Sequence, residues 1–169
     1  PLPVDGLVVM APHVFAEPSG LDGVQAARRA FDDGDLRARM ARHHRDPEVT
    51  FRNWNDVWLS TAFRDWDLRP QLPGIGCPVL AVQGTADPYG TVAHVEAVRD
   101  TARGPVELLV LDCGHAPHLE APEPTTAAVV RCVTAWSTAR HQARRPWPRH
   151  PRSPSRRASS ASPPWAAPW

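Results

Sequence analysis

Three short apolar runs, separated by longer helical patterns, constrain the fold of this chain more than any other feature. The runs cover residues 4–10, 79–84 and 106–111, and each is rich in Val and Leu. A short, nearly continuous apolar run is typical of a strand buried on both faces of a parallel sheet. Because helical patterns follow each run, strands and helices alternate along the chain. The sequence therefore predicts an α/β fold with about three parallel strands and flanking helices.

The segment between the first two strands, residues 14–75, is too long for a simple crossover. Its clearest helical pattern covers residues 47–59 and places Phe51, Trp54, Val57 and Trp58 at the spacing of one helix face. The other predicted helices cover about 21–34, 35–45, 91–103 and 122–139. We expect the segment to form a helical insert, and the small number of strands to be part of a larger domain.

Composition changes abruptly near residue 140. The segment 140–169 holds seven Arg, seven Pro and no acid, which leaves 12 Arg against 18 acids before it. The net charge of +1 therefore describes neither part. A stretch of this composition cannot build a core. We expect a partial domain over residues 1–139 and a disordered Arg/Pro/Ser-rich tail over 140–169, produced either by a frameshift or as a genuine basic segment.

Cysteine usage and hydropathy bear on cofactors and location. Cys77, Cys113 and Cys132 are widely spaced and odd in number, so they fit neither a disulfide framework nor a metal-binding pattern. No apolar run approaches the ~18–20 residues of a membrane span. No signal peptide is visible in a chain that begins without Met. We expect a cytoplasmic protein with no metal, no cofactor and no membrane partner.

Polar residues follow the strands at the point where each strand ends. They lie within the segments 11–13, 84–87 and 111–115. In parallel sheets the carboxyl ends of neighbouring strands meet at one edge, where ligands bind. A histidine that acts as a general base needs an ionised carboxylate to hold it in one tautomer. We therefore predict that Asp87 and His115 lie together at this edge as an acid–base pair.

Both loops resemble those of the α/β-hydrolases. Gly-Thr-Ala-Asp at 84–87 is similar to their acid loop, and Gly-His-Ala-Pro-His-Leu-Glu-Ala-Pro-Glu at 114–123 is similar to their histidine loop. The opening Gly-Leu-Val-Val-Met-Ala-Pro resembles the strand that follows the helix behind the nucleophile. The resemblance covers about residues 4–139 and implies the C-terminal part of an α/β-hydrolase fold. The small cap and its Trp-Asn-Asp-Val-Trp stretch are most similar to the branch of enol-lactonases and C–C bond hydrolases of aromatic catabolism.

The resemblance implies a serine hydrolase that acts on an ester, lactone or related small carbonyl compound without a cofactor. In the catalytic triad of such enzymes a serine attacks the carbonyl; His115 would accept the serine proton and Asp87 would orient the imidazolium. Asp112 is the rival acid, although a turn-capping role suits it better. Trp54 and Trp58 are the candidates to line the substrate pocket, with core positions as the alternative.

The nucleophile that the resemblance requires is absent from this sequence. No Ser lies in a Gly-x-Ser-x-Gly context. Cys113 lies only two residues before His115, so its thiol cannot easily point at this base as the nucleophile that the base would deprotonate. We expect the nucleophile before residue 1, so that this fragment alone is inactive. His13 follows the first strand and could face the site, with a structural role as the favoured interpretation. Glu120 is interpreted as a helix-start residue.

Two alternative functions stay open at this point. A haloalkane dehalogenase or epoxide hydrolase of the same fold uses an Asp nucleophile with the same His, and only the upstream residue separates it from a serine hydrolase. A non-catalytic binding protein would contact nucleic acid through the basic tail, 140–169. The favoured interpretation has a small-molecule substrate and no nucleic-acid partner.

Overall fold

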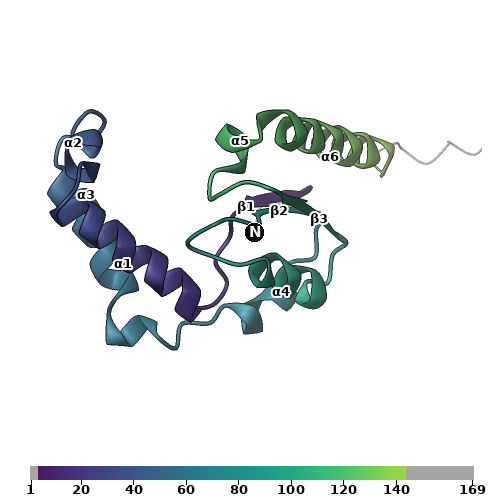
Figure 1. Ribbon diagram of the computed structural model, residues 1–169. Helices are drawn as coiled ribbons and strands as arrows, with labels where there is room; N and C mark the ends of the chain where they lie inside the picture. The colour runs from purple at the N-terminus through teal and green to yellow at the C-terminus, as the bar shows by residue number, and fades with distance from the viewer. Residues whose placement is uncertain (1–3, 144–169) are drawn as a thin grey trace, which may run out of the picture.

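A three-stranded parallel sheet forms the centre of the molecule in the computed structural model, which describes residues 4–143. The strands are β1 (Leu7–Met10), β2 (Val79–Gly84) and β3 (Val106–Leu111). Their order is β1-β2-β3, and both neighbouring pairs are parallel. The helix α4 (Ala93–Thr101) lies on one face of the sheet, and α6 (Pro122–Ala143) lies on the other (Figure 1). The predicted α/β class with three parallel strands is thus confirmed.

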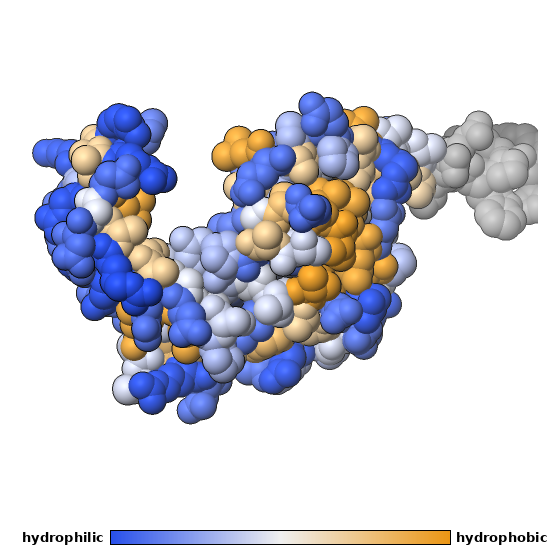
Figure 2. Space-filling view, viewed as in Figure 1, coloured by the Kyte–Doolittle hydropathy of each residue, from blue (hydrophilic) through white to orange (hydrophobic). Residues whose placement is uncertain are grey.

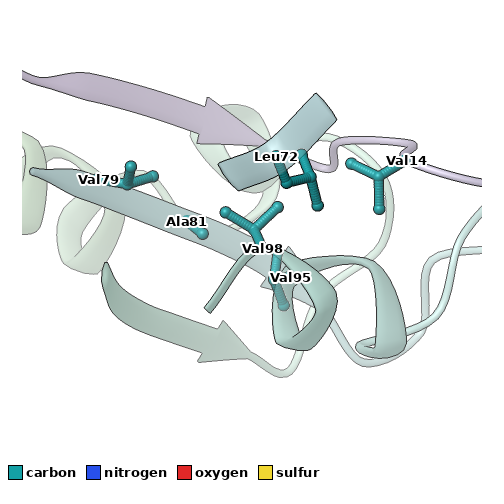
Figure 3. Packing of buried hydrophobic residues seen from close by; sticks show 6 residues of the cluster. All are labelled: Val14, Leu72, Val79, Ala81, Val95 and Val98. Carbon is teal, nitrogen blue, oxygen red and sulfur yellow. The ribbon is translucent and has the colours of Figure 1, made fainter. Parts of the chain in front are cut away.

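The central strand β2 carries an apolar core on each of its faces. Toward α4 the buried cluster consists of Val14, Leu72, Val79, Ala81, Val95 and Val98 (Figure 3). Toward α6 the cluster consists of Leu80, Val82, Ala128 and Cys132. Successive residues of a strand point to opposite faces, so one Val/Leu/Ala run supplies both cores. Every residue of β2 is buried, as the sequence predicts.

The prediction of burial on both faces is wrong for β1. All four of its residues are half-buried, because β2 is its neighbour on one side only among the described strands. The strand also begins at Leu7, later than the apolar run. Directly after it, Ala11 adopts a left-handed conformation with φ of 46°. This turn ends the strand and directs the chain toward His13.

The predicted insert forms a helical lobe, α1 to α3, beside the sheet (Figure 1). Its elements are α1 (Pro18–Asp32), α2 (Leu36–Met40) and α3 (Pro47–Trp58), followed by the short 3-10 helices η1 (Thr61–Phe63) and η2 (Arg69–Gly74). Phe31 and Phe51 stack in its core with ring centroids 4.0 Å apart. The two ends of the insert run side by side, since Ala16 N donates to Trp66 O and Leu68 N donates to Val14 O. We call this paired segment the neck.

The buried face of α3 differs from the predicted one. Phe51 is buried as expected, but Trp54 and Val57 are 37% and 51% exposed. Asn55 is fully buried instead, because its amide group donates to the carbonyl of Val24 in α1 at 2.9 Å. The polar Asn55 is therefore inside because it has a partner on α1, and the side of α3 that carries Trp54 and Val57 is exposed.

The last helix runs to Ala143, four residues beyond the predicted end near 139. A short helix, α5 (Pro117–Glu120), precedes it. The remainder of the predicted tail, 144–169, lies outside the described residues. Within residues 4–143, none of the helices combines the length and the apolar character that crossing a membrane requires.

Candidate active site

The loops that follow β2 and β3 are joined by their backbones. Thr85 N donates to Leu111 O at 2.8 Å, and Ala86 N donates to Cys113 O at 3.0 Å. Gly84 makes this approach possible, since a Cβ atom there would lie 2.2 Å from the carbonyl oxygen of Gly114. The two predicted site residues stand on these two loops.

Asp87 and His115 meet in the structure. Nδ1 of His115 lies 2.9 Å from Oδ2 of Asp87. Because an ionised carboxylate only accepts hydrogen bonds, the proton is on Nδ1 and Nε2 is left as the basic nitrogen. The Asp87 side chain is fully buried, whereas that of His115 is 45% exposed. The arrangement is that of an oriented general base, and its catalytic role stays a prediction.

Gln83 and Tyr89 hold the carboxylate in place. The Gln83 amide donates to Oδ2 of Asp87 at 2.9 Å and to the carbonyl of Gly90 at 3.0 Å. The backbone N–H of Tyr89 donates to Oδ1 at 2.9 Å. Gln83 was not among the predicted site residues. Its signal in the sequence is a polar side chain inside a strand that is otherwise apolar, where a buried amide requires partners.

Glu120 clamps the loop that carries His115. Its two carboxylate oxygens accept the backbone N–H groups of Gly114 at 2.7 Å and Ala116 at 3.0 Å. These bonds, that to Ala116 first, hold the pKa of the Glu120 carboxyl below its ordinary value. The structure places Glu120 in the single turn of α5, two residues before α6 begins. Its role is therefore to shape the histidine loop.

Two further histidines, His13 and His94, lie beside the acid–base pair. His13 donates from Nε2 to the carbonyl of Tyr89 at 2.8 Å. His94 is fully buried, accepts the Val14 N–H at 3.3 Å on Nδ1 and contacts Glu17 Oε1 through Nε2 at 2.9 Å. Burial lowers the pKa of His94 although Glu17 acts in the opposite direction. His94 is therefore a neutral structural residue that fixes the segment next to His13.

A cavity of about 230 Å³ opens beside His115. Its lining consists of His13, Val24, Trp54, Trp58, Tyr89 and His115. Figure 2 shows the surface hollowed between the helical lobe and the sheet body, where these segments face one another. Both predicted pocket residues, Trp54 and Trp58, thus reach the cavity. His13 also lines it, which was the less favoured of the two interpretations of this residue, and Val24 and Tyr89 join them without having been predicted to do so.

The other candidate residues do not join this arrangement. Cys113 is buried, which raises the pKa of its thiol, and the thiol contacts the carbonyl of Gly114 at 3.7 Å. Asp112 is exposed and lies 3.4 Å from the Thr85 hydroxyl, in keeping with a turn role. The second histidine of the same loop, His118, is exposed on α5 and also lies outside the arrangement. Across the described part of the chain, no group of three or more His, Cys, Asp or Glu is placed to hold a metal ion.

Comparison with known proteins rests on three-dimensional structure. No family model and no curated protein sequence matches the chain. A serine hydrolase involved in carbazole degradation matches it with a TM-score of 0.54 and 18% identity, over 78% of this chain and 55% of that one. A membrane phospholipase A, a bacterial virulence factor, matches with a TM-score of 0.51 and 19% identity, over 79% of this chain and 50% of that one.

An esterase from Exiguobacterium antarcticum matches with a TM-score of 0.50 and 22% identity, over 77% of this chain and 57% of that one. The chain thus spans about half the length of the solved structures it matches. At these identities the likeness concerns the fold. The three parallel strands and their flanking helices form part of an α/β-hydrolase fold.

Proposed function

We propose that this chain supplies the acid and the base of a serine hydrolase that acts on an ester, lactone or related carbonyl compound. Asp87 is the acid, and His115 is the base that takes a proton from the nucleophile and passes it to the leaving group. The observation that carries the proposal is the 2.9 Å contact between His115 Nδ1 and the buried Asp87 carboxylate, at the mouth of a cavity.

The cavity supports the assignment because it opens onto the histidine. A base can act only on groups within hydrogen-bond reach of its free nitrogen. His115 belongs to the lining of the cavity, so a ligand held there contacts the imidazole. The solved structures with the same fold include a serine hydrolase and an esterase, which is consistent with acyl transfer.

The nucleophile is proposed to come from residues outside this chain, so that residues 1–169 alone are inactive. Among the described residues, the hydroxyls of Ser60 and Thr138 donate to backbone carbonyls of their own segments. In this proposal the nucleophile and the oxyanion donors lie outside residues 1–169, so this chain alone lacks the main contributions to rate enhancement.

Hydrolysis of p-nitrophenyl acetate tests the proposal in two steps. The 169-residue chain should hydrolyse the ester no faster than its His115→Ala variant. The protein extended by the residues encoded upstream of Pro1 should be active. Its Asp87→Asn variant should lose about 10⁴-fold in kcat, because the imidazole then adopts the wrong tautomer.

His118→Ala is the matched control, since it removes an exposed histidine from the same loop. This variant should retain the activity of the extended protein. Turnover by the 169-residue chain that depends on His115 would overturn the proposed inactivity. Full activity of the extended protein after His115→Ala would overturn the role of the acid–base pair.

A further inference from the structure

The walls of the cavity beside His115 are almost entirely aromatic. Trp54 and Tyr89 meet edge to face, with ring centroids 6.0 Å apart and an interplanar angle of 84°. The rings of His13 and Trp58 also meet edge to face, with centroids 4.8 Å apart and an interplanar angle of 70°. Tyr89 also contacts His115 edge to face, with ring centroids 4.9 Å apart and an interplanar angle of 75°. Rings from the helical lobe, from the segment after β1 and from both site loops therefore surround one space. Such rings pack well against another flat ring, in offset or edge-on geometry.

The volume limits the occupant to a small molecule. The cavity measures about 230 Å³. An apolar protein cavity of about 150 Å³ is known to hold benzene. The space beside His115 thus suits one six-membered ring with a small substituent, and the substituent carries the reactive carbonyl group.

The lining also selects against an anion. None of its six residues is an Arg, Asp or Glu, so a bound carboxylate would give up its hydration without gaining an ionic partner. The Asp87 carboxylate, which contacts the His115 ring of the lining, repels a second negative charge.

A cation is the stronger rival, because aromatic rings attract positive charge. In the proposed reaction, however, His115 becomes positively charged while the ligand is bound. A cationic ligand in the same small cavity would oppose that step, since two like charges at this separation repel strongly outside bulk water. An uncharged ligand avoids both difficulties.

We propose that this cavity binds an uncharged, single-ring aromatic group, and that this group is the part of the substrate that the hydrolase recognises. The link to a substrate rests on the proposed function. The six lining residues named above all belong to this chain, so binding to them can be measured without turnover.

Isothermal titration of the full 169-residue chain with four matched probes tests the proposal. Benzamide is neutral and aromatic; benzoate and benzamidinium have nearly the same shape with a negative and a positive charge; cyclohexanecarboxamide keeps the amide without the flat ring. At pH 8, benzamide should bind about tenfold more tightly than either charged probe and several-fold more tightly than the cyclohexane compound.

Variants and contacts locate the binding. Trp54→Ala should weaken benzamide about tenfold, whereas Val130→Ala, which removes an exposed apolar side chain from α6, should leave its affinity unchanged. Nuclear Overhauser contacts between benzamide and the indole rings of Trp54 and Trp58 in the unmodified chain give the same information if the Trp54 variant does not fold.

The outcomes separate the alternatives. Tighter binding of benzamidinium would establish a cation site, and tighter binding of benzoate an anion site; either result overturns the proposal. Equal binding of the cyclohexane compound would remove the aromatic requirement, and no binding of any probe at millimolar concentration would remove the site. A failed ester assay with intact benzamide binding would instead count against the proposed function alone.

Discussion

Replacement of Gly84 by Ala should separate the two loops that hold the acid–base pair. Gly84 does not have a positive φ, so alanine is compatible with its backbone conformation. The added Cβ would however lie 2.2 Å from the carbonyl oxygen of Gly114 and 2.3 Å from that of Cys113. Both are backbone atoms, which cannot rotate away as a flexible side chain can. The loops must therefore move apart.

The size of the effect follows from two contributions. Overpacking of a close-packed site costs about 1–3 kcal/mol. Separation of the loops also weakens the bonds from Thr85 N to Leu111 O and from Ala86 N to Cys113 O, each of which contributes about 1 kcal/mol. We expect the free energy of unfolding to fall by about 3 kcal/mol, which lowers Tm by about 10 °C for a domain of this size.

Thermal unfolding followed by circular dichroism measures the change in stability, and proton NMR of the Nδ1–H of His115 reports on its bond to Asp87. Gly76→Ala is the matched control, because a Cβ there meets nothing within 4 Å. It should be neutral or stabilise the protein by about 0.4–1 kcal/mol. If Gly84→Ala unfolds at the same temperature as Gly76→Ala and keeps the Nδ1–H signal, the argument from close approach is refuted.

Three further predictions concern the groups that surround this site. The free energy of unfolding should decrease as pH falls below about 6.5, the ordinary pKa of histidine. Burial lowers the pKa of His94, so the unfolded chain then binds a proton that the folded one does not. Urea denaturation at pH 8 and pH 5.5 should show a smaller decrease for His94→Gln. Phe51→Ala should cost about 3–5 kcal/mol in the same assay, since it removes a buried ring stacked on Phe31, and a loss below 1 kcal/mol would mean that the lobe core is not well packed. The stabilisation from Glu120, whose pKa is lowered, is present above its ordinary value of 4.5 and disappears as pH falls through the lowered pKa; Glu120→Gln should therefore lose less stability between pH 6 and pH 3 than the unmodified protein, and equal losses would contradict the clamp.

The parts of the fold that depend on local pattern could be predicted from the sequence. The bounds of β2 and β3 agree with the apolar runs at 79–84 and 106–111, and α3 begins at Pro47 as its pattern indicates. A run of Val and Leu has few other ways to be buried, so short-range order is enough to identify it. The meeting of Asp87 and His115 follows from the parallel sheet, because strand ends of one sheet share an edge.

The surroundings of the pair depend on contacts between distant segments, which periodicity does not encode. His13 contacts Tyr89 across 76 residues of chain, and Glu17 contacts His94 across 77. Asn55 is buried because of a partner in another helix, against its polarity. Predictions from one helix at a time assign the inside of α3 to its most apolar side and miss such exchanges.

The neck has a consequence for how this architecture can change. The insert leaves the sheet near Val14 and returns near Leu68, at points joined by a direct hydrogen bond of 2.7 Å. Because the two ends already touch, a longer, shorter or different lobe can be placed between them at little cost in loop closure. Trp54 and Trp58 of the cavity belong to the lobe, whereas Asp87 and His115 lie on the loops after β2 and β3. Under the proposed function, the part of the cavity that the lobe supplies and the acid–base pair thus lie on separable segments, so the first can diversify while the second is retained.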